Sequence, residues 1–272
     1  MFIEVESITK YYKKFKAVDQ LSLTVQEGDI YGFLGPNGSG KSTTIRMILS
    51  LIKPTSGEIK LFGKAITSGK NMTLNRIGAL IEKPDFYNYL SAKKNLEILG
   101  KLSEVTPLKK RVDEVLDIVG LSDRGHSKVR TFSQGMKQRL GIAQTILHNP
   151  DLIILDEPTN GLDPQGQKEI RELILRLKEE RNITILISSH LLHEIELIAS
   201  RMIIINKGEA IIEGSVNGLL KESQQQVTIT VNNPEKTLQL INESDWANKM
   251  VSSAQEKFFF KISKDDIPAL NA

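Results

Sequence analysis

Cysteine is absent from this 272-residue sequence. Without thiols the chain can form neither a disulfide framework nor a zinc site built on thiolates, and such a composition suits a reducing compartment. An excess of charge of one sign is lacking as well, since the formal net charge is only +3. So small a charge does not indicate a nucleic-acid-binding surface, and we expect no nucleic acid among the partners.

Long hydrophobic runs are also missing. The longest uninterrupted apolar runs have four residues, as in LIIL (152–155) and MIII (202–205), whereas a membrane-spanning helix needs about 20 apolar residues. The opening segment MFIEVESITKYYKKF (1–15) lacks the apolar core and cleavage site of a signal peptide. We therefore expect a chain that does not itself span a membrane and that lies in the cytosol.

The apolar patterns that are present predict an α/β fold. Two segments alternate in the manner of antiparallel strands, FIEVESITKYY (2–12) and LSLTVQEG (21–28). Continuous apolar runs, typical of buried parallel strands, are IYGFLG (30–35), LIILDE (152–157) and ITILISS (183–189). Helical patterns separate these runs. They occupy the whole of about residues 85–147, which predicts an inserted helical subdomain.

A change in composition divides the chain after residue 222. The segments VTITV (227–231), PEKTLQLINES (234–244) and EKFFFKIS (256–263) predict a small β-α-β extension over residues 223–272, separate from a main domain over residues 1–222. The last segment, SKDDIPALNA (263–272), has the pattern of a capped helix start without a full apolar face. We expect the natural protein to be longer.

The segment GPNGSGKS, Gly35 to Ser42, matches the phosphate-binding pattern G-x-x-x-x-G-K-[ST] after a predicted strand and before a predicted helix. Main-chain N–H groups of such a loop surround phosphate oxygens, Lys41 supplies charge to the β and γ phosphates, and the Ser42 hydroxyl can ligate Mg²⁺. A flexible glycine turn is the alternative. With ATP and Mg²⁺ as cofactors, the candidate binding residues are Gly35, Pro36, Asn37, Gly38, Ser39, Gly40, Lys41, Ser42 and Thr43.

Two further strand ends carry polar side chains. Asp156 and Glu157 close the run LIILDE, where Asp156 would hold Mg²⁺ through water and Glu157 would polarise the attacking water. Adjacent strand residues point to opposite faces, but the strand ends here, so the second carboxylate can turn into the cleft. His190 follows ITILISS and could donate a hydrogen bond to the γ-phosphate. The alternatives are a solvated strand exit and a surface histidine.

The segment FSQGMKQRLGIAQ (132–144) opens a helix within the predicted helical subdomain. Ser133 and Gly135 at this helix N-terminus form a candidate anion site, with a plain N-cap as the alternative. Together, GPNGSGKS, FSQGMKQR, LIILDEP, NGLD and SSH follow the order and approximate spacing of the ATP-binding subunit of ABC transporters. The sequence resembles that family, with its P-loop NTPase core, over about residues 2–222.

The resemblance implies two subunits facing head to tail, as a homodimer or with a close paralogue. Each ATP would lie between one subunit's P-loop and the partner's segment from Ser133 to Gly135, with Asp163 at the interface. Tyr12 would stack on adenine, although the neighbouring Tyr11 and a core position for Tyr12 are alternatives. The sequence departs from the family's common L-S-G-G-Q signature at three of its five places, which hold Phe132, Gln134 and Met136.

Glu82 ends the segment IGALIE (77–82) where most members of the family carry glutamine. A solvated strand end is the ordinary interpretation of such a residue. The resemblance implies instead a contact with the nucleotide and its Mg²⁺. Together with GMKQRLGIA (135–143) and SSHLLHEIE (188–196), this glutamate makes the sequence similar to one branch of the family. That branch exports antimicrobial peptides such as bacitracin and lantibiotics. The resemblance thus implies an ATPase at the cytoplasmic face of the membrane, working with a separate permease.

Two other functions compete. A soluble ABC-type ATPase acting on nucleic acid or the ribosome usually carries two cassettes or a long coiled coil, whereas this chain has one cassette and no sustained heptads. A GTPase is suggested faintly by NKGE (206–209), which is similar to the guanine-reading N-K-x-D. The aspartate is missing, and a turn between two strands explains this segment better.

Overall fold

The computed structural model describes residues 1–66, 72–222, 225–242, 244–254 and 257–262. The chain divides into two compact units, Met1–Gly214 and Ser215–Ala272. The division precedes the short helix α7 (Val216–Glu222), whereas the sequence predicted a boundary after it. No helix within the described ranges is both long and apolar enough to cross a membrane.

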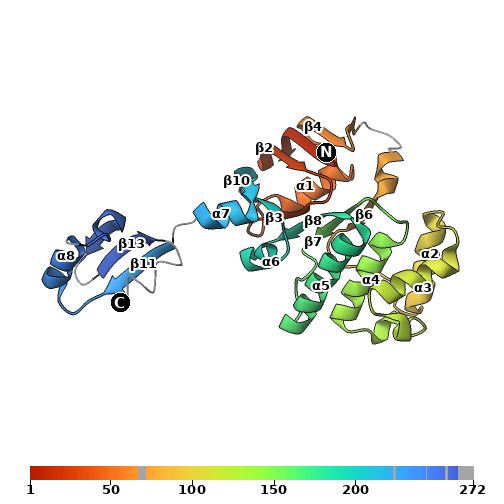
Figure 1. Cartoon of the computed structure of the whole chain (residues 1–272). Helices are drawn as coiled ribbons and strands as arrows, with labels where there is room; N and C mark the ends of the chain where they lie inside the picture. The colour runs from red at the N-terminus through yellow and green to blue at the C-terminus, as the bar shows by residue number, and fades with distance from the viewer. Residues whose placement is uncertain (67–71, 223–224, 243, 255–256, 263–272) are drawn as a thin grey trace. The chain divides into compact units, whose positions relative to one another are not determined.

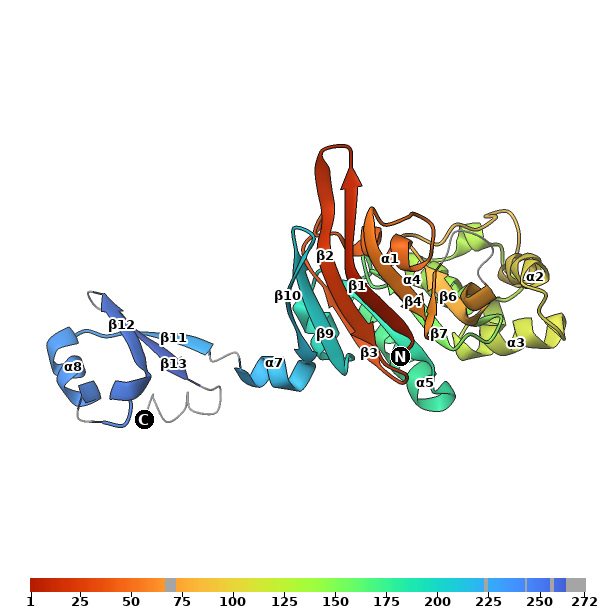
Figure 2. The same cartoon turned by 90° about the horizontal axis from the view of Figure 1, so that it is seen from above.

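The first unit begins with the predicted antiparallel subdomain, a four-stranded sheet of order β2-β1-β4-β5. Its strands are β1 (Ile3–Tyr12), β2 (Phe15–Val25), β4 (Ser56–Leu61) and β5 (Lys64–Ala65). The long hairpin of β1 and β2 stands out in Figure 2. Apolar side chains on one face of β1 and β2 are buried in the main core, as their alternation predicts.

The central sheet has the order β10-β9-β3-β8-β7-β6 (Figure 1). Its strands are β3 (Ile30–Leu34), β6 (Ile77–Leu80), β7 (Leu152–Asp156), β8 (Thr184–Ser189), β9 (Arg201–Asn206) and β10 (Glu209–Ser215). Adjacent strands from β9 to β6 pair in parallel, so their carboxyl ends meet at one edge. The NKGE segment forms the β9–β10 turn, as the strand pattern predicted.

Helices cover both faces of the central sheet. The helix α1 (Lys41–Ile48) buries Ile45 and Ile48 in the core shared by the two sheets, together with Phe33 of β3. On the other face α6 (Leu192–Glu196) lies so close to β3 that a Cβ at Gly32 would stand 2.3 Å from the Ile195 side chain. A glycine at this position therefore lets α6 reach the strand that precedes the P-loop.

The predicted helical subdomain is present. It contains α2 (Ala92–Leu102), α3 (Leu108–Ile118) and α4 (Gln134–Ile146), with short 3-10 turns at Ser122–Arg124 and Val129–Thr131. Another 3-10 turn, Met72–Arg76, precedes β6, and α5 (Pro164–Arg181) follows β7. The helix α4 returns to the sheet, where a Cβ at Gly78 of β6 would meet the Thr145 carbonyl at 2.0 Å. This close contact joins the subdomain to the sheet.

The second unit differs from the predicted β-α-β extension by one strand. After α7 it contains β11 (Gln225–Thr230), α8 (Pro234–Asn242), a 3-10 turn (Ala247–Lys249), β12 (Met250–Ala254) and β13 (Lys257–Ile262). The sheet order is β11-β13-β12 around a core of Ile241, Phe258 and Phe260. The edge strand β12, MVSSA, escaped prediction because its apolar and polar residues do not alternate. The predicted helix start at 263–272 lies outside the described residues.

Candidate functional site

Three adjacent strands bring the predicted motifs together. In the order β3-β8-β7, Leu34 pairs with Ser189 and Asp156 pairs with Ser188, so the three strands end at the same level. The P-loop leaves β3, the pair of carboxylates leaves β7, and His190 leaves β8. The predicted convergence of strand ends is therefore present in the fold.

The P-loop lysine is almost fully buried, with 4% of Lys41 exposed. Its ammonium group donates hydrogen bonds to the carbonyl oxygens of Gly35, at 2.7 Å, and Pro36, at 3.2 Å. The Glu157 carboxylate lies 3.2 Å from the same nitrogen. A buried ammonium needs such partners, and the ion pair links the P-loop directly to the end of β7.

The P-loop fits a phosphate group. Ser39 Oγ is buried and has no hydrogen-bond partner within the described residues, and no side chain caps the N-terminus of α1. Gly38 and Gly40 have φ angles of +79° and +107°, a conformation that glycine adopts without strain. These features leave donor groups free at the positive end of a helix, where they favour an anion.

Glu157 is turned toward the site by its backbone, because its φ of +49° ends the extended conformation of β7. Ser188 holds both carboxylate residues: its hydroxyl accepts from the Glu157 N–H at 2.9 Å and donates to Asp156 at 2.5 Å. Glu157 Oε2 lies 3.1 Å from His190 Nδ1 and accepts a hydrogen bond from the Asn160 amide at 3.3 Å. Such a carboxylate is positioned to orient a water and accept its proton.

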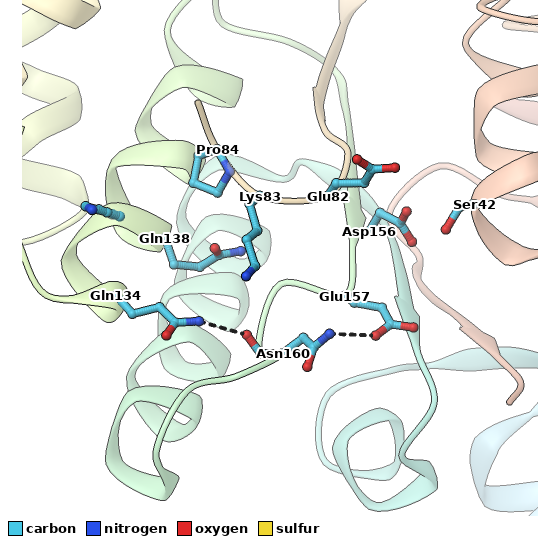
Figure 3. A pocket seen from close by; sticks show the side chains of 10 residues that line it. Ser42, Glu82, Lys83, Pro84, Gln134, Gln138, Asp156, Glu157 and Asn160 are labelled. Carbon is cyan, nitrogen blue, oxygen red and sulfur yellow. Dashed lines mark hydrogen bonds between the residues drawn. The ribbon is translucent and has the colours of Figure 1, made fainter. Parts of the chain in front are cut away.

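A cavity of about 560 Å³ adjoins these groups (Figure 3). The Ser42 hydroxyl and the Asp156 carboxylate face one another at its edge. No group of three or more His, Asp or Glu side chains in the described ranges could hold a metal ion by itself. The residues fit a magnesium ion that takes its remaining ligands from phosphate and water. The residues that line the cavity are Ser42, Glu82, Lys83, Pro84, Gln134, Lys137, Gln138, Asp156, Glu157 and Asn160.

Glu82 lies at this cavity but its carboxylate pairs with Arg46 in α1. Its side chain is 65% exposed and its φ is +62°. The carboxylate is therefore engaged by a cation outside the predicted metal site. Tyr12, at the end of β1, is half exposed with the Lys10 ammonium 5.5 Å from its ring centre, so it is not a core residue.

The remaining predicted residues gather at a second cavity, of about 510 Å³, which is lined by Ser133, Gly135 and Asp163. Ser133 caps α4 by accepting from the Met136 N–H, and Asp163 caps α5 by accepting from the Gly166 N–H, each at 3.2 Å. The cap at Ser133 is the alternative that the sequence pattern offered for that residue, whereas the cap at Asp163 was not predicted. The lining of this cavity includes no P-loop residue.

Sequence reasoning missed the groups that hold the carboxylates. Ser188, Asn160 and the buried Glu194 were not assigned, although each hydrogen bonds within the site. The pair of serines that ends a continuous apolar strand was the available signal, because hydroxyl groups at buried positions need partners. Ser188 has its partners Asp156 and Glu157 about 30 residues away in sequence, whereas Ser189 donates to Glu194 nearby on the following helix.

Comparison with known proteins identifies the family. Residues 18–160 match the model of the ABC transporter family. The chain is 48% identical over 241 residues to the bacitracin transport ATP-binding protein BcrA of Bacillus licheniformis, covering 89% of this chain and 78% of BcrA.

Two solved structures are similar. CbiO1 of Clostridium perfringens, part of the ABC transporter complex CbiONQ, has a TM-score of 0.75 and 26% identity, over 90% of this chain and 95% of CbiO1. The ATP-binding cassette MJ0796, in a dimeric post-hydrolysis state with ADP and Pi, has a TM-score of 0.69 and 27% identity, over 79% of this chain and 98% of that one. This chain belongs to the ABC transporter family, as an ATP-binding subunit that hydrolyses ATP.

Proposed function

We propose that this subunit powers the export of antimicrobial peptides or related drugs through a separate membrane permease. The observation that carries the proposal is the meeting of Lys41, Glu157 and His190 at one sheet edge, in a chain similar to a bacitracin transport protein. The subunit would lie at the cytoplasmic face of the cell membrane, held there by the permease. The soluble ATPase that acts on nucleic acid or the ribosome is not favoured.

Each part of the nucleotide has a proposed contact. Tyr12 stacks on adenine, the P-loop from Gly35 to Thr43 and its lysine bind the phosphates, and Ser42 and Asp156 hold Mg²⁺, directly and through water. When bound, the metal neutralises charge on the β and γ phosphates. Glu157 orients the attacking water and accepts its proton, while His190 donates a hydrogen bond to the γ-phosphate. The ion pair between Lys41 and Glu157 must loosen as the phosphates bind.

We further propose a head-to-tail dimer. Ser133, Gly135 and Asp163 line a cavity of their own, away from the P-loop of the same chain. A second copy facing the first would bring that cavity to the first copy's ATP. The Ser133 hydroxyl and the N-terminus of α4 would then supply additional donors to the γ-phosphate.

Glu82 has a proposed role that the structure sharpens. An exposed ion pair such as Arg46–Glu82 contributes only about 0–1 kcal/mol, so Glu82 can leave it at little cost. We propose that Glu82 leaves Arg46 when Mg²⁺ is bound at Ser42 and Asp156, since a carboxylate suits that ion. Its movement would report nucleotide state to the permease.

Glu82→Ala in the complete transporter is expected to reduce antibiotic protection several-fold while changing the ATPase rate less, because signalling rather than chemistry is lost. Glu82→Gln separates charge from hydrogen bonding. Both activities are measured side by side, with Glu58→Ala as control, since Glu58 is another exposed carboxylate in an ion pair. Unchanged protection in Glu82→Ala would leave the residue as a solvated strand end.

The proposed permease contact is the helical subdomain together with the loop from Glu82 to Tyr89, between β6 and α2. Tyr87 and Tyr89 are 53% and 66% exposed there, with ring centres 6.0 Å apart. Exposed aromatic side chains that lie close together are typical of protein interfaces.

A photo-crosslinking residue at Tyr89 is therefore expected to capture an integral membrane protein in native membranes, identified by mass spectrometry. The matched position is Leu240 of the second unit, which is 59% exposed. Crosslinks to the membrane protein from Leu240 alone would contradict this contact. Capture of a ribosomal protein at Tyr89 would favour the soluble ATPase.

A further inference from the structure

Glu194 of α6 is a buried carboxylate, with 6% of the residue exposed. Its Oε2 accepts two hydrogen bonds of 2.8 Å, from the hydroxyl groups of Thr159 and Ser189. Its Oε1 is buried without a hydrogen-bond partner in the described part of the chain. A hollow of about 190 Å³ borders Glu194, and Glu157 and His190 border the same hollow.

Stability alone does not explain this carboxylate. Burying a charge is costly, and an apolar side chain of similar volume is often as stable or more stable in such a position. Within the described residues, no nitrogen of Lys, Arg or His lies within the 4.0 Å of an ion pair with Glu194. The free-energy cost of burying this carboxylate indicates that the residue is needed for something other than packing.

The two hydroxyl donors belong to the segments that surround Glu157. Thr159 precedes Asn160, whose amide donates to Glu157, and Ser189 precedes His190, which lies beside Glu157. Ser189 Oγ also accepts from the N–H of the residue after His190, at 3.0 Å. One oxygen of Glu194 therefore connects the chain after β7 to the end of β8.

We propose that Glu194 is a positioning residue for ATP hydrolysis. By holding Thr159 and Ser189 at a fixed separation, it places the Asn160 amide and the His190 ring on the Glu157 carboxylate. It acts through these groups and does not touch the nucleotide. The inference rests on the proposed roles of Glu157 and His190. Glu194 hydrogen bonds to Thr159 and Ser189 and borders the hollow beside Glu157 and His190, but it does not line the cavity at Ser42 and Asp156, so we expect its effect mainly on the chemical step.

The test is a kinetic comparison of Glu194→Leu and Glu194→Gln in the full chain. Glu194→Leu removes the acceptor and is expected to lower kcat about 10- to 10²-fold, the scale of a small misplacement of reacting groups, with KM for ATP unchanged. Glu194→Gln keeps one accepting oxygen and should restore most of kcat. The control is Thr145→Val. Thr145 is buried like Thr159, but its hydroxyl donates to the Ile142 carbonyl, at 2.8 Å, and not to Glu194.

Thr159→Val and Ser189→Ala keep the proposal testable if Glu194→Leu does not fold, as judged by circular dichroism. Each should lower kcat, and the double variant should lose less than the product of the single losses, because both act through one carboxylate. The proposal would be overturned if the double variant lost the full product of the two single losses. It would also be overturned if KM changed as much as kcat, or if Glu194→Gln did not restore kcat. If Glu194→Leu keeps the wild-type kcat while Glu157→Gln is inactive, only this inference is overturned. If Glu157→Gln is active, the proposed function is overturned.

Discussion

Lys41→Ala is expected to lower ATP hydrolysis by at least about 10²-fold, the loss typical of removing one preorganised donor from a charged transition state. The structure makes the expected loss larger, because Lys41 is also the cation that faces Glu157 at 3.2 Å. Without it, the Glu157 carboxylate repels the γ-phosphate, and at about 4 Å two unit charges near a protein surface interact with about 4 kcal/mol. Release of phosphate and binding of a fluorescent ATP analogue measure the two effects.

The matched control is Lys168→Ala. Lys168 also forms an ion pair, with Glu172 on α5, but its side chain is 62% exposed. Removing this exposed cation should leave both measurements near the wild-type values. If Lys41→Ala hydrolyses ATP as fast as the wild type, the P-loop is not the phosphate site.

Glu157→Gln is expected to keep ATP affinity while slowing hydrolysis by about 10²-fold or more, because an amide cannot accept the proton of the attacking water. The amide is neutral, so Lys41 loses its carboxylate partner and is free for the phosphates. Binding should therefore be retained or tightened. An ATP-bound dimer should accumulate, and gel filtration with and without ATP detects it.

Glu172→Gln on α5 controls for the removal of a carboxylate from an exposed ion pair. It should hydrolyse ATP normally and form no lasting dimer. A Glu157→Gln protein that stays monomeric with ATP would contradict the head-to-tail dimer. Unchanged turnover would instead remove Glu157 from its proposed role.

The amino-acid sequence by itself determined the fold class and the positions of the motifs. Buried parallel strands are recognisable from continuous apolar runs, and their ends at Leu34, Asp156 and Ser189 locate the site because parallel strands end at one edge. The P-loop is a local structure, so its spacing of glycine, lysine and serine is sufficient to predict it. The helical subdomain followed in the same way from its periodicity.

Only the tertiary structure decided which distant side chains meet. Arg46 binds Glu82, and Thr159 binds Glu194, through contacts that depend on how α1 and α6 pack against the sheet. No local pattern reports such packing, since the same residues at the same spacing would also suit solvent-exposed positions. The separation of Ser133 and Asp163 from the P-loop likewise depends on where packing places the N-termini of α4 and α5. Hydrophobic periodicity specifies which face of a helix is buried, but close packing of side chains determines its neighbours.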